Sequence, residues 1–228
     1  MKYKMIIFDA DETLFDFSKS ERHAFENAMN DHNIEYKEEY HLPLYKKINI
    51  AVWEEFERGE ITQKELKVKR FRRFLSSINN NCEPRSFMER YTLHLAHASF
   101  LFDGAEKLVE ALSKKHRLIF VTNGLTKVQK HRIRESVIAH YFERIIISEE
   151  IGYAKPNPMI FIEGLKGLDL PDKSEIIIVG DSLTSDIPGG INYGIDTVWY
   201  NPNKKKNNSP YTPTYEIDNL EKLIKANL

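Results

Sequence analysis

Four short apolar runs, rich in β-branched residues, place the strongest limit on how this chain can fold. They are Met5–Phe8, Leu118–Val121, Ile145–Ile147 and Ile176–Val179, with Thr197–Tyr200 as a fifth and weaker run. None alternates strictly between apolar and polar residues, which is typical of strands buried on both faces of a parallel sheet. The sequence therefore favours a sheet covered by helices on each side.

Amphipathic helical patterns lie between these runs. Ala105–Leu112 carries apolar residues at the i, i+3, i+4 and i+7 positions of a helix. Asn157 and Pro158 resemble an N-cap followed by the first helical position, and they predict a helix that continues to Leu168. Strand then alternates with helix from Phe102 onward, which predicts an α/β fold with a doubly wound, Rossmann-like parallel sheet.

The stretch from residue 16 to residue 99 does not show this alternation of strand and helix. It contains no convincing strand, and its aromatic residues recur at helical spacing. Thr62 and Glu65 have the spacing of a capping box at a helix start. We therefore expect an all-helical unit over 16–99, inserted into an α/β core domain formed by 1–15 and 100–228. Near the C-terminus, Pro202–Thr214 reads as a loop.

Composition and charge exclude several classes of protein. The 228 residues carry 33 Lys and Arg against 34 Asp and Glu, so no charge excess favours a nucleic-acid polymer or a membrane surface as partner. The apolar run Met5–Phe8 is too short for a signal peptide, and the single Cys82 fits a reducing compartment. We expect a cytoplasmic protein, and the sequence leaves open whether it is a monomer or a homodimer.

Two carboxylates follow the first predicted strand. Asp9 and Asp11 stand in Asp9-Ala10-Asp11-Glu12-Thr13, at the strand end where open α/β sheets bind their ligands. Such a pair can hold a hard cation or divide the roles of nucleophile and acid/base. The simpler interpretation is an Asx turn that ends the strand.

Three further groups stand in similar positions. Asp181 and Asp186, in Gly180-Asp181-x4-Asp186, follow the fourth strand. Thr122 and Asn123 follow the second, where a hydroxyl, an amide and backbone N–H groups can cradle a phosphate. Lys155 lies in a loop stiffened by two prolines and can balance carboxylates and a phosphate. Each group alone is compatible with an ordinary turn or a solvated lysine. Acids clustered with one lysine imply a divalent cation, and oxygen ligands favour Mg²⁺.

The four motifs together resemble those of the haloacid dehalogenase-like (HAD) hydrolases, in the order of that family. The helical insert resembles the C1 cap of the same family. Longer strings resemble the pyrimidine 5′-nucleotidases that act on non-canonical nucleotides; these strings are Phe8–Phe15, Ile147–Asn157 and Ser185–Asn192.

This resemblance implies a phosphatase that hydrolyses phosphate monoesters through an aspartyl-phosphate. Asp9 is then the nucleophile and Asp11 the general acid and base. The implied phosphate ligands are Thr122, Asn123 and Lys155. The implied cofactor is Mg²⁺, with Mn²⁺ as the alternative, on Asp9, Asp181 and the Asp11 backbone carbonyl, while Asp186 and Thr13 play supporting roles. Glu12 departs from the family, because many relatives carry Gly there.

Several alternatives stay open at this point. The small-molecule substrate can be a nucleoside 5′-monophosphate, a sugar phosphate or another small phosphate monoester, and a phosphomutase shares the same core. Dehalogenases of the family lack the second acid, which disfavours that activity. A non-catalytic phospho-acceptor or binding module needs neither the paired acids nor a large insert. The aromatic residues of the insert can stack on a base or simply form core; the candidates are Phe15, Phe17, Tyr45, Trp53 and Phe56.

Overall fold

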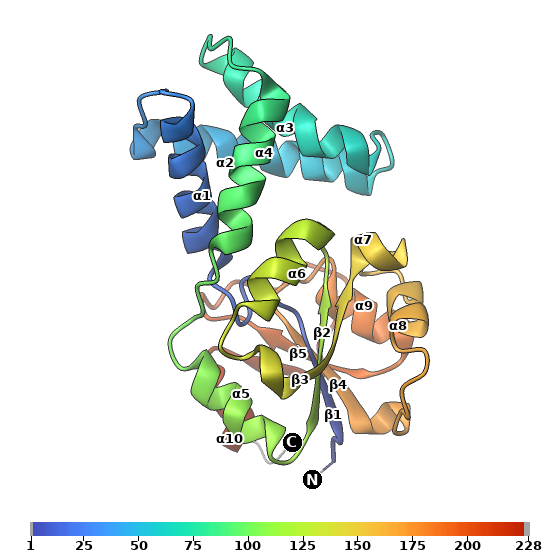
Figure 1. The fold of residues 1–228 in the computed structure, drawn as a ribbon. Coiled ribbons are helices and arrows are strands. Elements are labelled where there is room, and N and C mark those ends of the chain that lie inside the picture. Colours follow the sequence, from blue (N-terminus) through green and yellow to red (C-terminus); the bar gives the residue numbers. More distant parts are fainter. Residues whose placement is uncertain (1, 226–228) are drawn as a thin grey trace. The chain divides into compact units, whose positions relative to one another are not determined.

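The computed structural model describes residues 2–225, and the chain forms two compact units (Figure 1). One unit takes the chain up to Phe17 and again from Ser99 onward, and the other is Ser18–Ala98.

The first unit is built on a six-stranded sheet in which every neighbouring pair is parallel. Its strands are β1 (Met5–Phe8), β2 (Arg117–Thr122), β3 (Phe142–Ile147), β4 (Ile176–Gly180), β5 (Asp196–Tyr200) and β6 (Tyr215–Ile217), in the order β3-β2-β1-β4-β5-β6. All five predicted strands are present. The short edge strand β6 was missed, because its three residues follow a long polar loop and carry little apolar signal.

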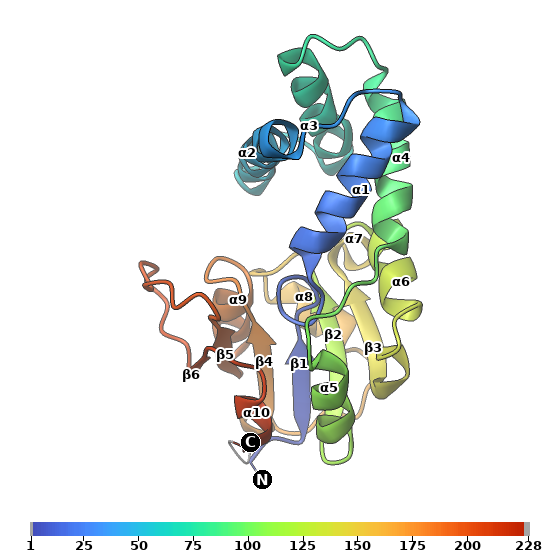
Figure 2. The ribbon, with the colours of Figure 1, turned by 90° about the vertical axis from the view of Figure 1, so that its left-hand side faces the viewer.

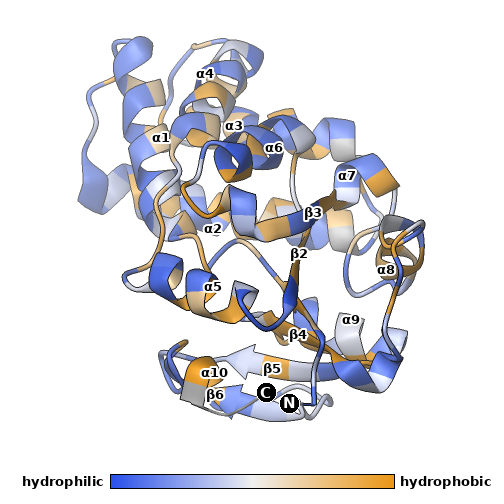
Figure 3. Cartoon of the chain, turned by 60° about the horizontal axis from the view of Figure 1, so that its bottom comes forward, coloured by the Kyte–Doolittle hydropathy of each residue, from blue (hydrophilic) through white to orange (hydrophobic). Residues whose placement is uncertain are grey.

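Side chains of the central strands divide evenly between two cores. In β1, Ile6 and Phe8 pack on one face, whereas Met5 and Ile7 pack on the other. Figure 2 looks onto the face that α5 and α10 cover, and α8 and α9 cover the opposite face. Figure 3 shows β2 and β4 as largely hydrophobic, while the helices mix polar and apolar residues. The predicted doubly wound α/β fold class is therefore confirmed.

The helices of this unit are short. They are α5 (Ala105–Ser113), α6 (Thr126–Arg134), α7 (Ser148–Ile151), α8 (Met159–Gly164), α9 (Asp186–Tyr193) and α10 (Lys222–Lys225). The prediction that the helix after Pro158 continues to Leu168 is wrong, because α8 ends at Gly164 and the chain then turns through Gly167 at a φ of +79°. No helix within residues 2–225 has the length and apolar character needed to cross a bilayer.

The second unit consists of helices. They are α1 (Phe17–Asp31), α2 (Glu38–Glu57), α3 (Gln63–Ser77) and α4 (Pro84–His97). The capping box predicted at Thr62 and Glu65 is present at the start of α3. Tyr45 is fully buried and stacks between Phe25 and Phe71, with ring centroids 4.5 and 5.5 Å away. Tyr45 therefore belongs to the core of the helical unit, and the fully buried Phe15 belongs to the core beside the sheet.

The chain leaves the α/β unit and returns to it along two paired segments. Phe15 and Leu101 form an antiparallel bridge. Asp16 N–H donates to the Phe100 carbonyl at 3.0 Å, and Phe102 N–H donates to the Leu14 carbonyl at 3.0 Å. The inserted helices are thus connected to the sheet unit through neighbouring points of the chain.

Candidate active site

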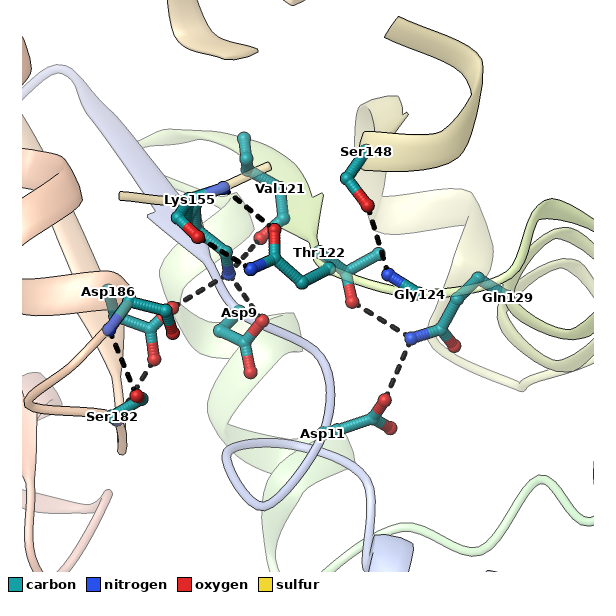
Figure 4. Close-up of polar contacts among 12 residues, drawn as sticks. Asp9, Asp11, Val121, Thr122, Gly124, Gln129, Ser148, Lys155, Ser182 and Asp186 are labelled. Atoms are coloured by element: carbon teal, nitrogen blue, oxygen red, sulfur yellow. Dashed lines mark hydrogen bonds and ion pairs between the residues drawn. The ribbon is translucent and has the colours of Figure 1, made fainter. Parts of the chain in front are cut away.

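The predicted polar residues meet at the carboxyl ends of three adjacent strands (Figure 4). Asp9 and Asp11 follow β1, Thr122 ends β2, and Asp181 follows β4. Because β1 lies between β2 and β4, these side chains converge around the end of β1.

Lys155 forms ion pairs with both Asp9, the candidate nucleophile, and Asp186. Its side chain is buried, and its Nζ lies 2.6 Å from Asp9 Oδ1 and 2.7 Å from Asp186 Oδ1. It also donates to the Val121 carbonyl at 2.6 Å, at the end of β2. Burial lowers the pKa of Lys155, but Asp186 and Asp9 more than offset this and raise it above its ordinary value. The lysine is therefore a fixed cation between two strand ends.

The acids around Lys155 carry more negative charge than the lysine neutralises. Burial, followed by repulsion from Asp186 and Asp181, raises the pKa of Asp9 well above its ordinary value, although Lys155 opposes the rise. Burial, then the charges of Asp186 and Glu12, raise the pKa of Asp181 to about 7. Without another cation, these carboxyl groups are held together at an electrostatic cost.

This acidic cluster fits a divalent cation. Asp9, Asp181 and Asp186 each place a carboxylate oxygen within 4.8 Å of the others. Three carboxylates against one lysine leave two uncompensated negative charges, and oxygen ligands suit Mg²⁺. Two further contacts hold Asp181 and Asp186 in place. Trp199 Nε1–H donates to the Asp181 carbonyl at 2.9 Å, and Ser182 N–H donates to Asp186 Oδ2 at 3.0 Å.

The motif Gly180-Asp181-x4-Asp186 requires glycine at its first position, because a side chain there has no space. A Cβ atom at this position would lie 2.3 Å from the carboxyl group of Asp186. The Asp186 side chain therefore folds back across the glycine, which allows it to reach Lys155.

Asn123 clamps the backbone of Lys155. Its Nδ2 donates to the Lys155 carbonyl and its Oδ1 accepts from the Lys155 N–H, both at 2.8 Å. This leaves one N–H of the amide for another acceptor, so the phosphate contact expected of Asn123 stays a prediction.

Asp11 contacts two residues that the sequence analysis did not single out. Gln129 Nε2 donates to Asp11 Oδ2 at 2.8 Å, and Arg132 Nη2 forms an ion pair with Asp11 Oδ1. The Arg132 side chain is fully buried, and its guanidinium lies over the rings of Phe15 and Phe17. In Figure 4 the Asp11 carboxylate points toward Gln129.

The loop between Asp9 and Phe15 is conformationally demanding. Glu12 has a φ of +57°, in the left-handed region that favours glycine, which accounts physically for Gly at this position in many members of the family that the chain resembles. Thr13 is fully buried, and within residues 2–225 its hydroxyl has no hydrogen-bond partner. Its expected role in orienting the loop stays a prediction.

Comparison with known proteins gives consistent matches. The sequence profile of the haloacid dehalogenase-like hydrolases matches residues 6–200. The pyrimidine 5′-nucleotidase PynA of Streptococcus pneumoniae is 32% identical over 228 residues, covering 98% of this chain and 94% of PynA. The pyrimidine 5′-nucleotidase YjjG of Escherichia coli is 32% identical over 223 residues, covering 98% of this chain and 97% of YjjG.

A solved structure is similar over its whole length. The crystal structure of the HAD-hydrolase YfnB of Bacillus subtilis bound to magnesium has a TM-score of 0.93 and 34% identity, with 99% of each chain covered. The resemblance drawn from the four motifs is confirmed by these matches.

Proposed function

This chain belongs to the haloacid dehalogenase-like hydrolases and is a phosphoric monoester hydrolase, and we propose that its substrates are nucleoside 5′-monophosphates, pyrimidine nucleotides first. The similarity to two pyrimidine 5′-nucleotidases supports this substrate class, because it extends over almost the whole chain and includes the helical insert. A sugar phosphate or another small phosphate monoester is the alternative.

The observation that carries the proposed mechanism is the position of Asp9. Its carboxylate lies at the end of β1, held by Lys155, with Thr122 on the neighbouring strand β2. In the first step an Asp9 oxygen attacks phosphorus, the bond to the ester oxygen breaks, and an aspartyl-phosphate forms. Water then attacks this phosphorus, which releases inorganic phosphate and regenerates Asp9.

Asp11 is proposed to move the proton in both steps. It first protonates the leaving alkoxide and then accepts a proton from the attacking water. The ion pair with the buried Arg132 supports this proposal because it holds the Asp11 side chain at the end of β1, beside Thr122.

Three residues are proposed to hold the phosphoryl oxygens. Lys155 supplies the fixed positive charge, Thr122 a hydroxyl donor, and Asn123 its remaining amide N–H. Asp9, Asp181 and the Asp11 backbone carbonyl would hold Mg²⁺ or Mn²⁺, with Asp186 in support. When bound, the cation would neutralise the charge that carboxylates and phosphate bring together.

A substrate screen tests the proposed function. Purified protein is assayed with Mg²⁺ against nucleoside monophosphates and hexose phosphates, and kcat/KM is compared. We expect pyrimidine nucleotides to lead, with activity lost in EDTA, restored by Mg²⁺ or Mn²⁺, and inhibited by Ca²⁺, whose looser coordination misplaces the nucleophile. A sugar phosphate preferred by tenfold, about 1.4 kcal/mol of transition-state discrimination, would reject the nucleotidase proposal.

A further inference from the structure

One buried side chain connects two groups of the proposed active site. Gln129 Nε2 donates to Asp11 Oδ2 and to Thr122 Oγ1, each at 2.8 Å. Its Oε1 accepts from Arg132 Nη2 at 2.7 Å. Gln129 is almost completely buried, and both ends of its amide are engaged.

The orientation of this amide follows from the chemistry of its neighbours. A guanidinium group has only donors, so the atom facing Arg132 must be the amide oxygen. A carboxylate accepts only, so the atom facing Asp11 must be the amide nitrogen. Both neighbours therefore require the same orientation of the Gln129 amide. The buried guanidinium of Arg132 offers only donors, so it can face the amide oxygen but not the amide nitrogen.

This orientation constrains the Thr122 hydroxyl. Because Thr122 Oγ1 accepts from Gln129, the hydroxyl proton is what remains for donation to a phosphoryl oxygen. Asp11 Oδ2 and Thr122 Oγ1 bond the same nitrogen, so they lie within two hydrogen-bond lengths of each other. Asp11, the proposed acid/base, is thus held next to the Thr122 hydroxyl, a proposed ligand of the phosphoryl group.

Gly124 makes room for Gln129. A Cβ atom at Gly124 would lie 2.9 Å from Gln129 Cγ and 3.0 Å from its Nε2. The backbone of Gly124 does not have a positive φ, so the glycine is needed there for space rather than for conformation. The third residue of Thr122-Asn123-Gly124 therefore serves the placement of Gln129.

We propose that Gln129 is a positioning residue, oriented by Arg132, that sets the Asp11 carboxylate for proton transfer and the Thr122 hydroxyl for donation to the phosphoryl group. The inference rests on the proposed function only in giving Asp11 the acid/base role. It does not depend on which phosphate monoester is the natural substrate.

The test measures how strongly the rate depends on the leaving group. Phenyl phosphate releases phenol, whose pKa of about 10 resembles that of tyrosine, and it gains from a proton donor. The nitrophenolate of p-nitrophenyl phosphate leaves without one. The variants are Gln129→Leu, which removes the amide donors, Arg132→Lys, which replaces the planar guanidinium facing the amide oxygen with an ammonium group, and Gly124→Ala, which crowds the amide. Arg134→Met, at an exposed arginine of the same helix, is the control.

We expect Gln129→Leu to lower kcat for phenyl phosphate roughly tenfold more than for p-nitrophenyl phosphate, as partial loss of general acid catalysis predicts. Arg132→Lys and Gly124→Ala should also lower kcat more for phenyl phosphate than for p-nitrophenyl phosphate, but by a smaller factor. Arg134→Met should leave kcat unchanged for both substrates. Equal slowing of both substrates in the folded variants would overturn the proposal, and so would no slowing at all.

Two further measurements show whether a negative result comes from loss of fold, from the proposed mechanism or from the positioning role. Thermal unfolding of each variant identifies loss of fold, and if Gln129→Leu does not fold, the Arg132→Lys and Gly124→Ala results decide. Wild-type protein that hydrolyses neither aryl phosphate contradicts the proposed phosphatase mechanism itself. Wild type that hydrolyses both, with no split among the variants, contradicts only the positioning role.

Discussion

The two aspartates of the first motif lie two residues apart, yet each has a different kind of buried cation as partner. Asp9 contacts Lys155, which Asp186 also contacts. Asp11 contacts Arg132, which no other carboxylate approaches as an ion pair within residues 2–225. The Asp9 side of the site thus has surplus negative charge, and the Asp11 side does not.

The difference matches the two proposed roles. The additional carboxylates around Asp9, the proposed nucleophile, can serve as ligands for a divalent cation. Without a cation, these carboxylates repel one another. A dedicated arginine and an oriented amide instead hold one carboxylate in a defined position. Substitutions that remove one charge from each side should therefore have opposite effects on stability.

The largest expected effect comes from Asp9→Asn. It removes the proposed nucleophile, so kcat should fall by about 10⁴-fold or more. In EDTA at pH 8, its unfolding temperature should equal or exceed that of the wild type, because one charge leaves a repulsive cluster. Activity assays and calorimetry check both statements, with Asp103→Asn at an exposed site as control. A clear drop in unfolding temperature would show that Asp9 stabilises the fold.

Asp11→Asn should be slower by about 10²–10⁴-fold with a nucleotide, because it removes acid and base help while preserving shape. With p-nitrophenyl phosphate the first step should largely recover and the second should not. Stopped-flow measurement should show a burst of nitrophenol followed by near arrest, with phosphate trapped on Asp9. Equal slowing of both substrates without a burst would make Asp11 structural.

The same variant should also lose stability. Arg132 is fully buried and would keep its charge without a carboxylate partner, while Asp11 itself is a quarter exposed, which weakens the effect. We expect a loss of about 1–2 kcal/mol, or roughly 2–4 °C in unfolding temperature for each kcal/mol. An unchanged unfolding temperature would mean that solvent already screens the pair.

The smallest effect is a pH dependence at Asp181. Its pKa is raised from 3.8 to about 7, so between these values the folded state binds the proton more tightly than the unfolded state does. The stability that Asp181 contributes to the metal-free protein therefore falls as pH rises through this window. In EDTA, Asp181→Asn should unfold several degrees higher than wild type at pH 8, by a smaller margin at pH 5, and no higher below pH 3.8, where the unfolded carboxyl is protonated as well.

Comparing the two proteins at each pH cancels other titrating groups, such as His41, whose lowered pKa acts in the opposite direction. Addition of Mg²⁺ at pH 8 should reverse the order, because the variant lacks one proposed ligand. The same difference at both pH values would show that Asp181 does not titrate in this window.

The parallel sheet and the strand-end motifs could be predicted because both depend on local patterns. Each strand is a run of apolar residues, and each polar group of the site comes directly after such a run or lies in a loop with strong Gly and Pro signals. Asp9, Thr122 and Asp181 were found on this basis. The order of the strands and the family resemblance then place them near one another.

Gln129 and Arg132 were missed because they lie inside a helix rather than at a strand end. They occupy buried positions of α6 next to Val128 and Ile133, so two polar residues lie on the apolar face of an amphipathic helix. This pattern is a usable signal, since buried polar side chains need partners. Their partner Asp11, more than a hundred residues earlier, could be identified only from the structure.

The paired segments around Phe15 and Leu101 bear on how such proteins diversify. Because the chain departs and returns at hydrogen-bonded neighbours, the sheet unit already holds the two ends of the insert together. Lengthening or replacing residues 18–98 then adds only a slowly growing loop-closure entropy and breaks no strand of the sheet. The hydrolytic machinery can stay constant over evolution while the helical segment is exchanged, and new substrates can be recruited without rebuilding the fold.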